Sequence, residues 1–278
     1  MTITQIKQLM RRHDCKPLKW LGQNFLIDRN IVDKIVASAG FGADDTVLEI
    51  GAGMGNMTVD IAHRVRRVIA LEYDKKLCAI LRETAQGHPS IEPVCQDIAK
   101  FDIGSCARGR AVRVIGNLPY YITSLILEYI VVHRAYIRDA LIMVQKEVKD
   151  RLIARPGGKV YGALTCFVAY HARIECRGII KRTSFFPQPE VDSALIYLRM
   201  LDAPSVGVDD EKLFFRIIRT AFNQRRKTIV SSLSRNRVLG IDRKKVERLL
   251  ERSGVPPDAR PESLGLEDFA RISHEFPR

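Results

Sequence analysis

Short apolar runs recur through much of this chain, with helical stretches between most neighbouring runs. They cover residues 46–50, 68–71, 91–95, 112–115 and 140–144. Strands that are apolar along their whole length are typical of a parallel sheet covered by helices on both faces. The alternation therefore predicts βαβ units around a mostly parallel sheet.

The pattern changes toward the C-terminus. Residues 172–180 and 191–200 are longer strand-like runs with no obvious helix between them, so we expect an antiparallel edge. After a linker at residues 202–205, apolar residues recur at helical spacing from 213 to 222, and two shorter helical stretches follow. We predict an α/β domain over residues 1–203 and a small all-α domain over residues 204–278.

Charge and apolar content limit the class of partner. The formal net charge is +13 at pH 7. A surplus of this size usually accompanies a polyanionic partner such as nucleic acid, although a solvated basic surface is the alternative. The apolar stretches are too short to span a membrane, and residues 1–14 lack the apolar core of a signal peptide. We expect a cytoplasmic protein with no membrane partner.

The cysteines do not show the spacing that is typical of metal ligands. Cys15, Cys78, Cys95, Cys106, Cys166 and Cys176 are scattered, with no C-x-x-C pair and no histidine at ligand spacing. We expect six reduced thiols of a cytosolic protein and no metal site.

A glycine loop, E-I-G-A-G-M-G-N at residues 49–56, follows the first strand and opens a helix. Glycines allow sharp turns and close approach of a ligand, which makes Gly51 and Gly53 candidate binding positions. The dinucleotide pattern G-x-G-x-x-G would need a glycine where Asn56 stands. The spacing G-x-G-x-G, with an acidic residue two positions before it, is more typical of S-adenosyl-L-methionine binding.

Acidic residues end the next two predicted strands. Glu72 lies about twenty residues after the loop, where it can accept both ribose hydroxyls of such a ligand. Asp97 can accept from the adenine amine, and Ile98 can pack on the ring. Either carboxylate alone could be a solvated loop residue, but three successive strand ends with this chemistry favour a cofactor site.

The segment N-L-P-Y at residues 117–120 follows another strand, where ligands bind in open α/β sheets. The Asn117 side chain and a backbone carbonyl of the Leu118-Pro119 turn can accept both hydrogens of a planar amine. Tyr120 can stack on the ring that carries the amine, and Phe185 can cover its other face. Ordinary core aromatics are the alternative for both rings. This set predicts methylation of an aromatic amino nitrogen.

Basic residues crowd the start of the C-terminal domain. Arg219, Arg225, Arg226 and Lys227 are candidates for phosphate contacts, and Lys19 flanks the cofactor segment. A solvated charged face is the alternative.

Taken together, these segments resemble the ribosomal RNA adenine N6,N6-dimethyltransferase family, most closely its bacterial 16S branch. The resemblance starts at Leu21 and rests also on L-G-Q-N-F-L at 21–26, Q-K-E-V at 145–148, F-F-P-Q-P-E-V-D-S at 185–193 and A-F-N-Q-R-R-K at 221–227. It implies a Rossmann-like class I methyltransferase fold. It adds cofactor contacts at Asn24 and Leu26, with Gln23 beside them, and supports Gly51, Glu72, Asp97 and Asn117 as cofactor contacts. It also supports Asn117, Tyr120 and Phe185 around the base.

The resemblance further implies the substrate: N6 of two adjacent adenosines near the 3′ end of 16S rRNA, in the immature small ribosomal subunit. The family usually has proline where Leu125 stands and often arginine where Ala163 stands. A 23S rRNA adenine methyltransferase conferring antibiotic resistance, a protein or small-molecule amine methyltransferase and a mainly non-catalytic assembly checkpoint factor remain alternatives. Nothing in the sequence demands a dimer, so we expect a monomer. The order of the methylations stays open.

Overall fold

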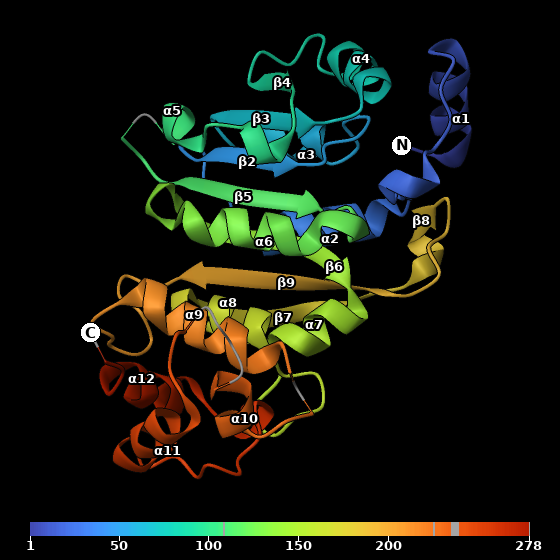
Figure 1. Ribbon diagram of the computed structural model, residues 1–278. Helices are drawn as coiled ribbons and strands as arrows, with labels where there is room; N and C mark the ends of the chain where they lie inside the picture. Colours follow the sequence, from blue (N-terminus) through green and yellow to red (C-terminus); the bar gives the residue numbers. More distant parts are fainter. Residues whose placement is uncertain (108, 225, 235–238, 278) are drawn as a thin grey trace. The chain divides into compact units, whose positions relative to one another are not determined.

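The computed structural model describes residues 1–107, 109–224, 226–234 and 239–277 (Figure 1). The chain divides into two compact units. The first contains Met1–Lys149 and Ile174–Met200, and the second contains Asp150–Arg173 and Leu201–Arg278. Among the described residues, no helix combines the length and the apolar composition needed to cross a membrane.

The first unit is built on a seven-stranded sheet with the order β4-β3-β2-β5-β6-β9-β7. The strands are β2 (Thr46–Ile50), β3 (Arg67–Glu72), β4 (Ile91–Cys95), β5 (Val112–Asn117), β6 (Ile137–Gln145), β7 (Ala172–Ile180) and β9 (Ser193–Met200). The pairs from β4 to β6 are parallel, and β9 runs antiparallel to β6. The predicted mostly parallel sheet with an antiparallel edge is confirmed.

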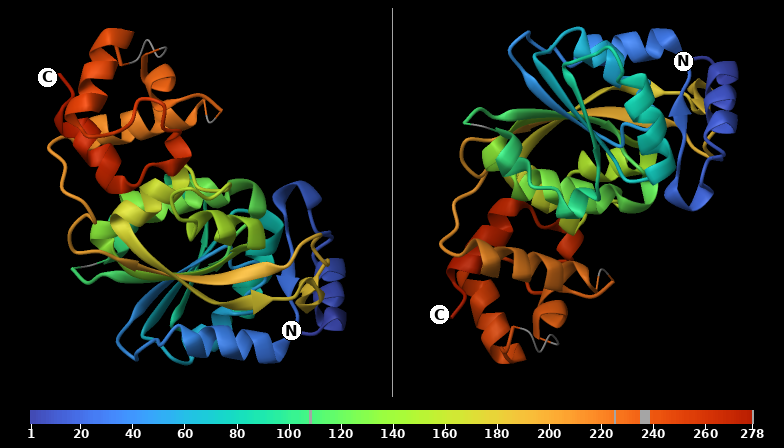
Figure 2. Two further views of the ribbon diagram at one scale, coloured as in Figure 1. Left: turned by 90° about the horizontal axis from the view of Figure 1, so that it is seen from below. Right: turned by 90° about the horizontal axis from the view of Figure 1, so that it is seen from above.

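Helices cover both faces of this sheet, with α2 and α6 on opposite sides (Figure 2). The helices of this unit are α2 (Arg29–Ser38), α3 (Thr58–Ala62), α4 (Lys75–Thr84), α5 (Ile103–Ala107) and α6 (Thr123–Val132), whereas α7 (Lys146–Leu152) crosses the boundary between the two units. Asp28 caps α2 by accepting from the backbone N–H groups of Asn30 and Ile31. The apolar face of α2 packs in one core cluster with Val47 and Val68 of the sheet.

A small additional sheet joins distant parts of the chain. β1 (Phe25–Leu26) pairs antiparallel with β8 (Phe185–Phe186), so that Leu26 lies opposite Phe185. Before it, α1 (Ile3–Arg12) begins with a capping box at Thr2 and Gln5. This helix buries Ile6 and Met10 in a cluster with Phe25. The sequence analysis predicted neither α1 nor this pairing.

The second unit is helical. It contains α8 (Ala163–His171), α9 (Glu211–Phe222), α10 (Ile229–Ser234), α11 (Arg243–Arg252) and α12 (Leu266–His274). Phe214 and Ile218 of α9 are fully buried in its core, with Phe269 of α12. The predicted small helical domain is therefore present, although α10 was not predicted.

The boundary between the units differs from the expected one after residue 203, because Asp150–Arg173 belongs to the second unit. The reason is packing: α8 contributes Cys166 and Tyr170 to the core cluster that is built around α9. Tyr170 lies 5.1 Å from Phe214 between ring centroids.

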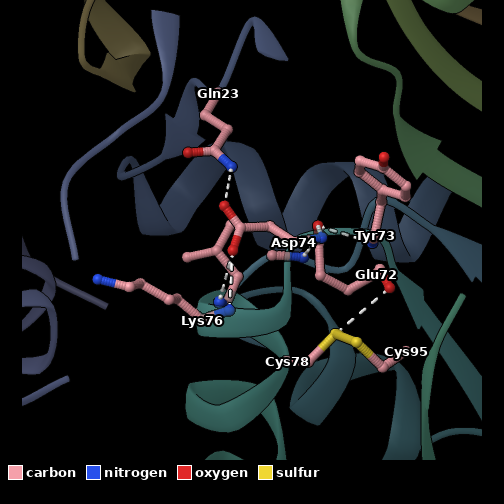
Figure 3. The surroundings of a disulfide bond; sticks show 9 residues. Gln23, Glu72, Tyr73, Asp74, Lys76, Cys78 and Cys95 are labelled. Carbon is pink, nitrogen blue, oxygen red and sulfur yellow. Dashed lines mark hydrogen bonds between the residues drawn. A yellow bond between two sulfur atoms is a disulfide. The ribbon is translucent and has the colours of Figure 1, made fainter. Parts of the chain in front are cut away.

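The expectation of six reduced cysteines is wrong for one pair. Cys78 on α4 and Cys95 at the end of β4 form a disulfide, with their Cα atoms 5.8 Å apart, beside Glu72 (Figure 3). The 17-residue separation hid this proximity, because α4 returns the chain onto the neighbouring strand. Cys15, Cys106, Cys166 and Cys176 are free.

Arg113 of β5 is the centre of a buried ion cluster. It is 4% exposed, and its Nε donates to Asp139 of β6 at 2.8 Å. Its other nitrogens donate to the carbonyl oxygens of Ala39 and Gly40 at 2.6 Å and to Asp45 at 3.2 Å. One guanidinium therefore ties the end of α2 to two strands.

We expect Arg113→Met to lower the free energy of unfolding by about 3–5 kcal/mol, because the buried carboxylate of Asp139 loses its 2.8 Å guanidinium partner and keeps only the longer contact with Arg138. Arg138→Met is the matched control. Arg138 is half-exposed and contacts the same two carboxylates at 3.4 Å, so its loss should cost at most about 1 kcal/mol. Urea unfolding followed by circular dichroism measures both, and equal small losses would contradict the assignment.

Candidate active site

A cavity of about 300 Å³ opens at the carboxyl ends of β2, β3, β4 and β5, where open α/β sheets bind ligands. Every residue that the sequence analysis assigned to the cofactor lines it: Gln23, Asn24, Leu26, Gly51, Gly53, Glu72, Asp97, Ile98 and Asn117. Of the predicted catalytic residues, Asn117 is among the lining residues, whereas Leu118, Tyr120 and Phe185 are not.

The glycine loop forms one wall of the cavity. Gly51 and Gly53 have φ angles of +73° and +59°, which L side chains rarely adopt. A Cβ atom at Gly51 would lie 3.4 Å from the backbone oxygen of Asn117, and one at Gly53 would lie 3.4 Å from the Phe25 ring. The loop therefore passes close to both the end of β5 and the N-terminal segment.

Glu72 ends β3 with its carboxylate held by backbone donors. Oε2 accepts from Gly53 at 2.8 Å. Oε1 accepts from Tyr73 at 2.9 Å and from Asp74 at 2.8 Å (Figure 3). Burial raises the pKa of Glu72, and these three hydrogen bonds oppose that rise. The carboxylate is oriented at the cavity wall, as acceptance of two ligand hydroxyls requires.

Asp97 lies two residues beyond β4. One of its oxygens accepts from Ala99 at 2.9 Å and caps a short 3-10 turn, Ile98–Lys100. Ile98 is 5% exposed at the cavity wall. Gln96 donates its backbone N–H to the Glu72 carbonyl at 3.0 Å, which fixes Asp97 relative to Glu72.

Side-chain hydrogen bonds hold the N-terminal segment at the strand ends. Gln23 donates to Asp74 at 2.9 Å and accepts from the backbone N–H of Leu18 at 2.8 Å (Figure 3 shows the first bond). The Asn117 amide nitrogen donates to the backbone oxygen of Asn24 at 2.8 Å. Residues from the beginning of the chain and from the sheet therefore share one cavity.

Two motifs meet at Tyr120. Its hydroxyl lies 3.0 Å from the hydroxyl oxygen of Ser193, the last residue of F-F-P-Q-P-E-V-D-S, and burial raises the pKa of Tyr120. Leu118 is 1% exposed, and its backbone N–H donates to Met143 of β6 at 3.1 Å. The turn after β5 is therefore anchored on β6 and on the first residue of β9.

Phe185 occupies a different environment from the one predicted for a stacking residue. It is 3% exposed and packs in the core cluster that also contains Leu26, its partner across the β1–β8 pair. The structure does not bring its ring to the cavity wall beside Asn117.

The sequence analysis missed several cavity-lining side chains. Tyr121 is 52% exposed and Trp20 is 67% exposed, and both line the opening. Burial raises the pKa of Tyr121, and the nearby charges of Asp97 and Glu72 add to the rise. Only its position directly after N-L-P-Y could have indicated a role for Tyr121.

Glu49, the acidic residue of the glycine motif, also lines the cavity and is 1% exposed. Oε2 accepts from the Thr58 hydroxyl at 2.6 Å, whereas Oε1 has no hydrogen-bond partner among the described residues. A buried unpartnered oxygen at a cavity wall fits a ligand that brings its own donor or positive charge. Together with Glu72 and Asp97, it suits an adenosyl ligand with a cationic end.

Some of the candidate RNA-binding residues are exposed in the structure, and others lie outside its described residues. Arg226 and Lys227 are exposed, and Arg219 on α9 lines a shallow hollow with Arg216 and Lys212. Arg225 and the side chain of Lys19 lie outside the described residues; the backbone of Lys19 is in a 3-10 turn, Lys19–Leu21.

Within the described ranges, no group of three or more His, Cys, Asp or Glu side chains could hold a metal ion.

This sheet order, with an antiparallel strand beside β6 and a glycine loop after β2, defines a class I methyltransferase. The family model for "Ribosomal RNA adenine dimethylase" matches residues 16–276, so the chain belongs to that family. The family expected from the sequence motifs is thus confirmed.

Relatives and solved structures agree with this assignment. The chain is 43% identical over 274 residues to "Ribosomal RNA small subunit methyltransferase A" of Moorella thermoacetica, covering 95% of this chain and 94% of the relative. It is similar to a dimethyladenosine transferase from Plasmodium falciparum, with a TM-score of 0.77, 26% identity and coverage of 91% and 97%. A 23S rRNA methyltransferase, ErmE, gives a TM-score of 0.68, 28% identity and coverage of 92% and 100%.

Proposed function

We propose that this enzyme transfers methyl groups from S-adenosyl-L-methionine to N6 of two adjacent adenosines near the 3′ end of 16S rRNA. The products are N6,N6-dimethyladenosines in the immature small subunit, made in the cytoplasm by a monomer. One observation carries the proposal: the predicted cofactor residues and Asn117 share one cavity in a chain of the adenine dimethylase family. The 43% identity to a small-subunit enzyme, against 28% to a 23S enzyme, favours 16S rRNA.

Different cavity residues bind different parts of the cofactor. Glu72 accepts from the ribose hydroxyls, Asp97 accepts from the adenine amine, and the backbone around Gly51 approaches the amino-acid end. S-adenosyl-L-methionine supplies an electrophilic methyl group when bound.

Asn117 and the turn after it activate the amine. The lone pair of adenine N6 is delocalised into the ring, so the nitrogen must become pyramidal before it can attack. The Asn117 amide nitrogen is engaged by Asn24, which leaves its oxygen as an acceptor. The Pro119 carbonyl already accepts from Ile122 and Thr123, so the Leu118 carbonyl is the turn's candidate for the second N–H. Direct in-line transfer then depends on position and electrostatics.

Tyr120 holds the face of the base, and its hydroxyl bond to Ser193 orients the ring. An unstacked base on an aromatic ring gains about 1–3 kcal/mol. Phe185 can cover the other face only if its ring leaves the core cluster beside Leu26. In the conformation described here it supports the cavity wall through Leu26.

The direct test is incubation with unmethylated 30S particles and labelled cofactor, followed by primer extension to map modified adenosines. We expect two adjacent dimethylated adenosines near the 3′ end of 16S rRNA. A parallel reaction with 50S particles tests the resistance-type alternative, which label on 23S rRNA alone would favour. Absence of transfer, with normal subunit maturation in cells, would favour an assembly factor.

We expect Asn117→Ala to reduce methyl transfer by about 100-fold or more, because the amine loses an acceptor that is used in the transition state. Fold and 30S binding should be unchanged by circular dichroism and filter binding. Asn30→Ala, an exposed position on α2, is the matched control. Near-normal turnover of Asn117→Ala in a radiolabelled methyl assay would refute the two-acceptor clamp.

Tyr120→Ala should lower kcat/KM by about 5- to 150-fold, which corresponds to the loss of about 1–3 kcal/mol of stacking. Tyr120→Phe keeps the ring and removes only the bond to Ser193, so most of the rate should remain. Single-turnover kinetics measures both variants. An unchanged rate for Tyr120→Ala would count against stacking, and equal losses would assign the effect to the hydroxyl.

Arg226→Gln combined with Lys227→Gln should weaken binding to 30S particles and reduce the slope of log K against log salt by about two. Two phosphate contacts would be lost, and each releases roughly one counterion. Lys34→Gln combined with Arg64→Gln, at exposed positions of the first unit, is the control. An unaltered slope would show that Arg226 and Lys227 do not contact RNA.

A further inference from the structure

The disulfide between Cys78 and Cys95 lies beside Glu72 (Figure 3). Cys95 ends β4 two residues before Asp97, and the Cys78 sulfur lies 3.3 Å from the backbone oxygen of Glu72. The Glu72 carboxylate accepts from the backbone N–H of Asp74, the residue that caps α4. The disulfide therefore joins the helix whose cap orients Glu72 to the strand that leads to Asp97.

The carboxyl end of β4 has limited support from the sheet. β4 is the edge strand beside β3, and its third residue, Pro93, has no N–H to donate to the ladder. Beyond the strand, the Gln96 N–H donates to the Glu72 carbonyl at 3.0 Å. Without the covalent bond, these weaker contacts must keep Asp97 near Glu72, so we expect the end of β4 to open more often.

The two sulfurs of the bond differ in access. Cys95 is exposed, whereas Cys78 is 1% exposed. Thiol–disulfide exchange begins when a thiolate attacks an accessible sulfur. A small thiol can therefore attack Sγ of Cys95, so that the S–S bond breaks and Sγ of Cys78 leaves with the electron pair and takes up a proton. A second thiol then displaces the first from Cys95. The protein gains two electrons and two protons, and the two thiols become one disulfide.

The reduced form has a partner for its buried thiol. The Cys78 S–H can donate to the Glu72 backbone oxygen, which also accepts from Gln96. Breaking the bond therefore leaves this buried thiol with a hydrogen-bond acceptor, as a reversible change requires. In a reducing compartment such as the proposed cytoplasm, disulfides are usually transient and redox-sensing.

We propose that Cys78 and Cys95 form a redox switch of cofactor affinity, in which the disulfide form binds S-adenosyl-L-methionine more tightly than the dithiol form. The inference rests on the proposed function, because the cofactor and its contacts with Glu72 and Asp97 come from there. The disulfide holds these two acceptors together before the ligand arrives, whereas the dithiol form must order the end of β4 during binding. Neither cysteine lines the cavity, so KM for the cofactor should change and kcat at saturation should not.

Isothermal titration calorimetry with S-adenosyl-L-homocysteine compares the two forms of the wild-type protein. One sample is treated with glutathione disulfide and the other with dithiothreitol, and the excess reagent is removed. Peptide mapping by mass spectrometry should find the bond between Cys78 and Cys95 in the first sample alone, and circular dichroism checks the fold of both. We expect the Kd of the reduced form to be higher by about fivefold or more, as is typical of coupled equilibria.

Thermodynamic linkage provides a second measurement. The ligand must stabilise the disulfide by the same factor by which the disulfide tightens ligand binding. A saturating concentration of S-adenosyl-L-homocysteine should therefore lower the reduction potential of the pair, by about 30 mV for each tenfold difference in affinity. A titration with glutathione and its disulfide measures this potential. A disulfide that only supports the fold would keep the same potential with and without the ligand.

Cys78→Ser combined with Cys95→Ser should bind the ligand with one affinity after either treatment, close to that of the reduced wild-type protein. Cys106→Ser combined with Cys176→Ser removes two free thiols and should keep the wild-type response.

The inference is overturned if the wild-type protein binds the ligand equally well with and without the disulfide, if reduction unfolds it, or if glutathione disulfide fails to form the bond. Should the variant without Cys78 and Cys95 fail to fold, the two forms of the wild-type protein still decide. Failure of both forms to bind the ligand would instead refute the cofactor of the proposed function and the inference with it.

Discussion

The close approach of β2 and β5 at their carboxyl ends is the constraint on which the site depends. A Cβ atom at Gly116 would lie 2.5 Å from the backbone oxygen of Ile50, a separation that real Cβ atoms do not adopt. Glycine at this position lets the two strand ends lie together, and Gly51 continues the same contact against the Asn117 carbonyl. The glycine loop and the amide of Asn117 consequently face one cavity. A side chain at Gly116 would separate the glycine loop from Asn117, the proposed acceptor for the target amine.

Residues placed directly after strands could be predicted from the sequence, because a parallel sheet brings successive carboxyl ends to one edge. Glu72, Asp97 and Asn117 met for this reason, without any knowledge of their contacts. The environment of Phe185 could not be predicted in this way. Its two-residue strand has no periodicity to detect, and its partner Leu26 is far away in sequence. The disulfide and the transfer of Asp150–Arg173 to the second unit depend on tertiary packing in the same way.

Glu72 and Glu49 lie on adjacent strands but differ in the hydrogen-bond donors that hold their side chains. Glu72 and Glu49 are both almost fully buried, but Glu72 accepts from three backbone N–H groups and Glu49 accepts from one hydroxyl. Backbone donors cannot move away or titrate, so the orientation of Glu72 is set before any ligand arrives. Glu49 has no comparable support and depends on what enters the cavity.

The proposed adenine acceptor, Asp97, follows β4, the edge strand of the sheet and its least supported position. β4 pairs only with β3, and much of it is exposed. Two contacts compensate at its carboxyl end: the backbone bond from Gln96 to Glu72, and the disulfide from Cys95 to Cys78 on α4. Both lie within two residues of Asp97. An edge strand that frays would carry Asp97 away from Glu72, so these contacts keep the proposed adenine and ribose acceptors at a constant separation.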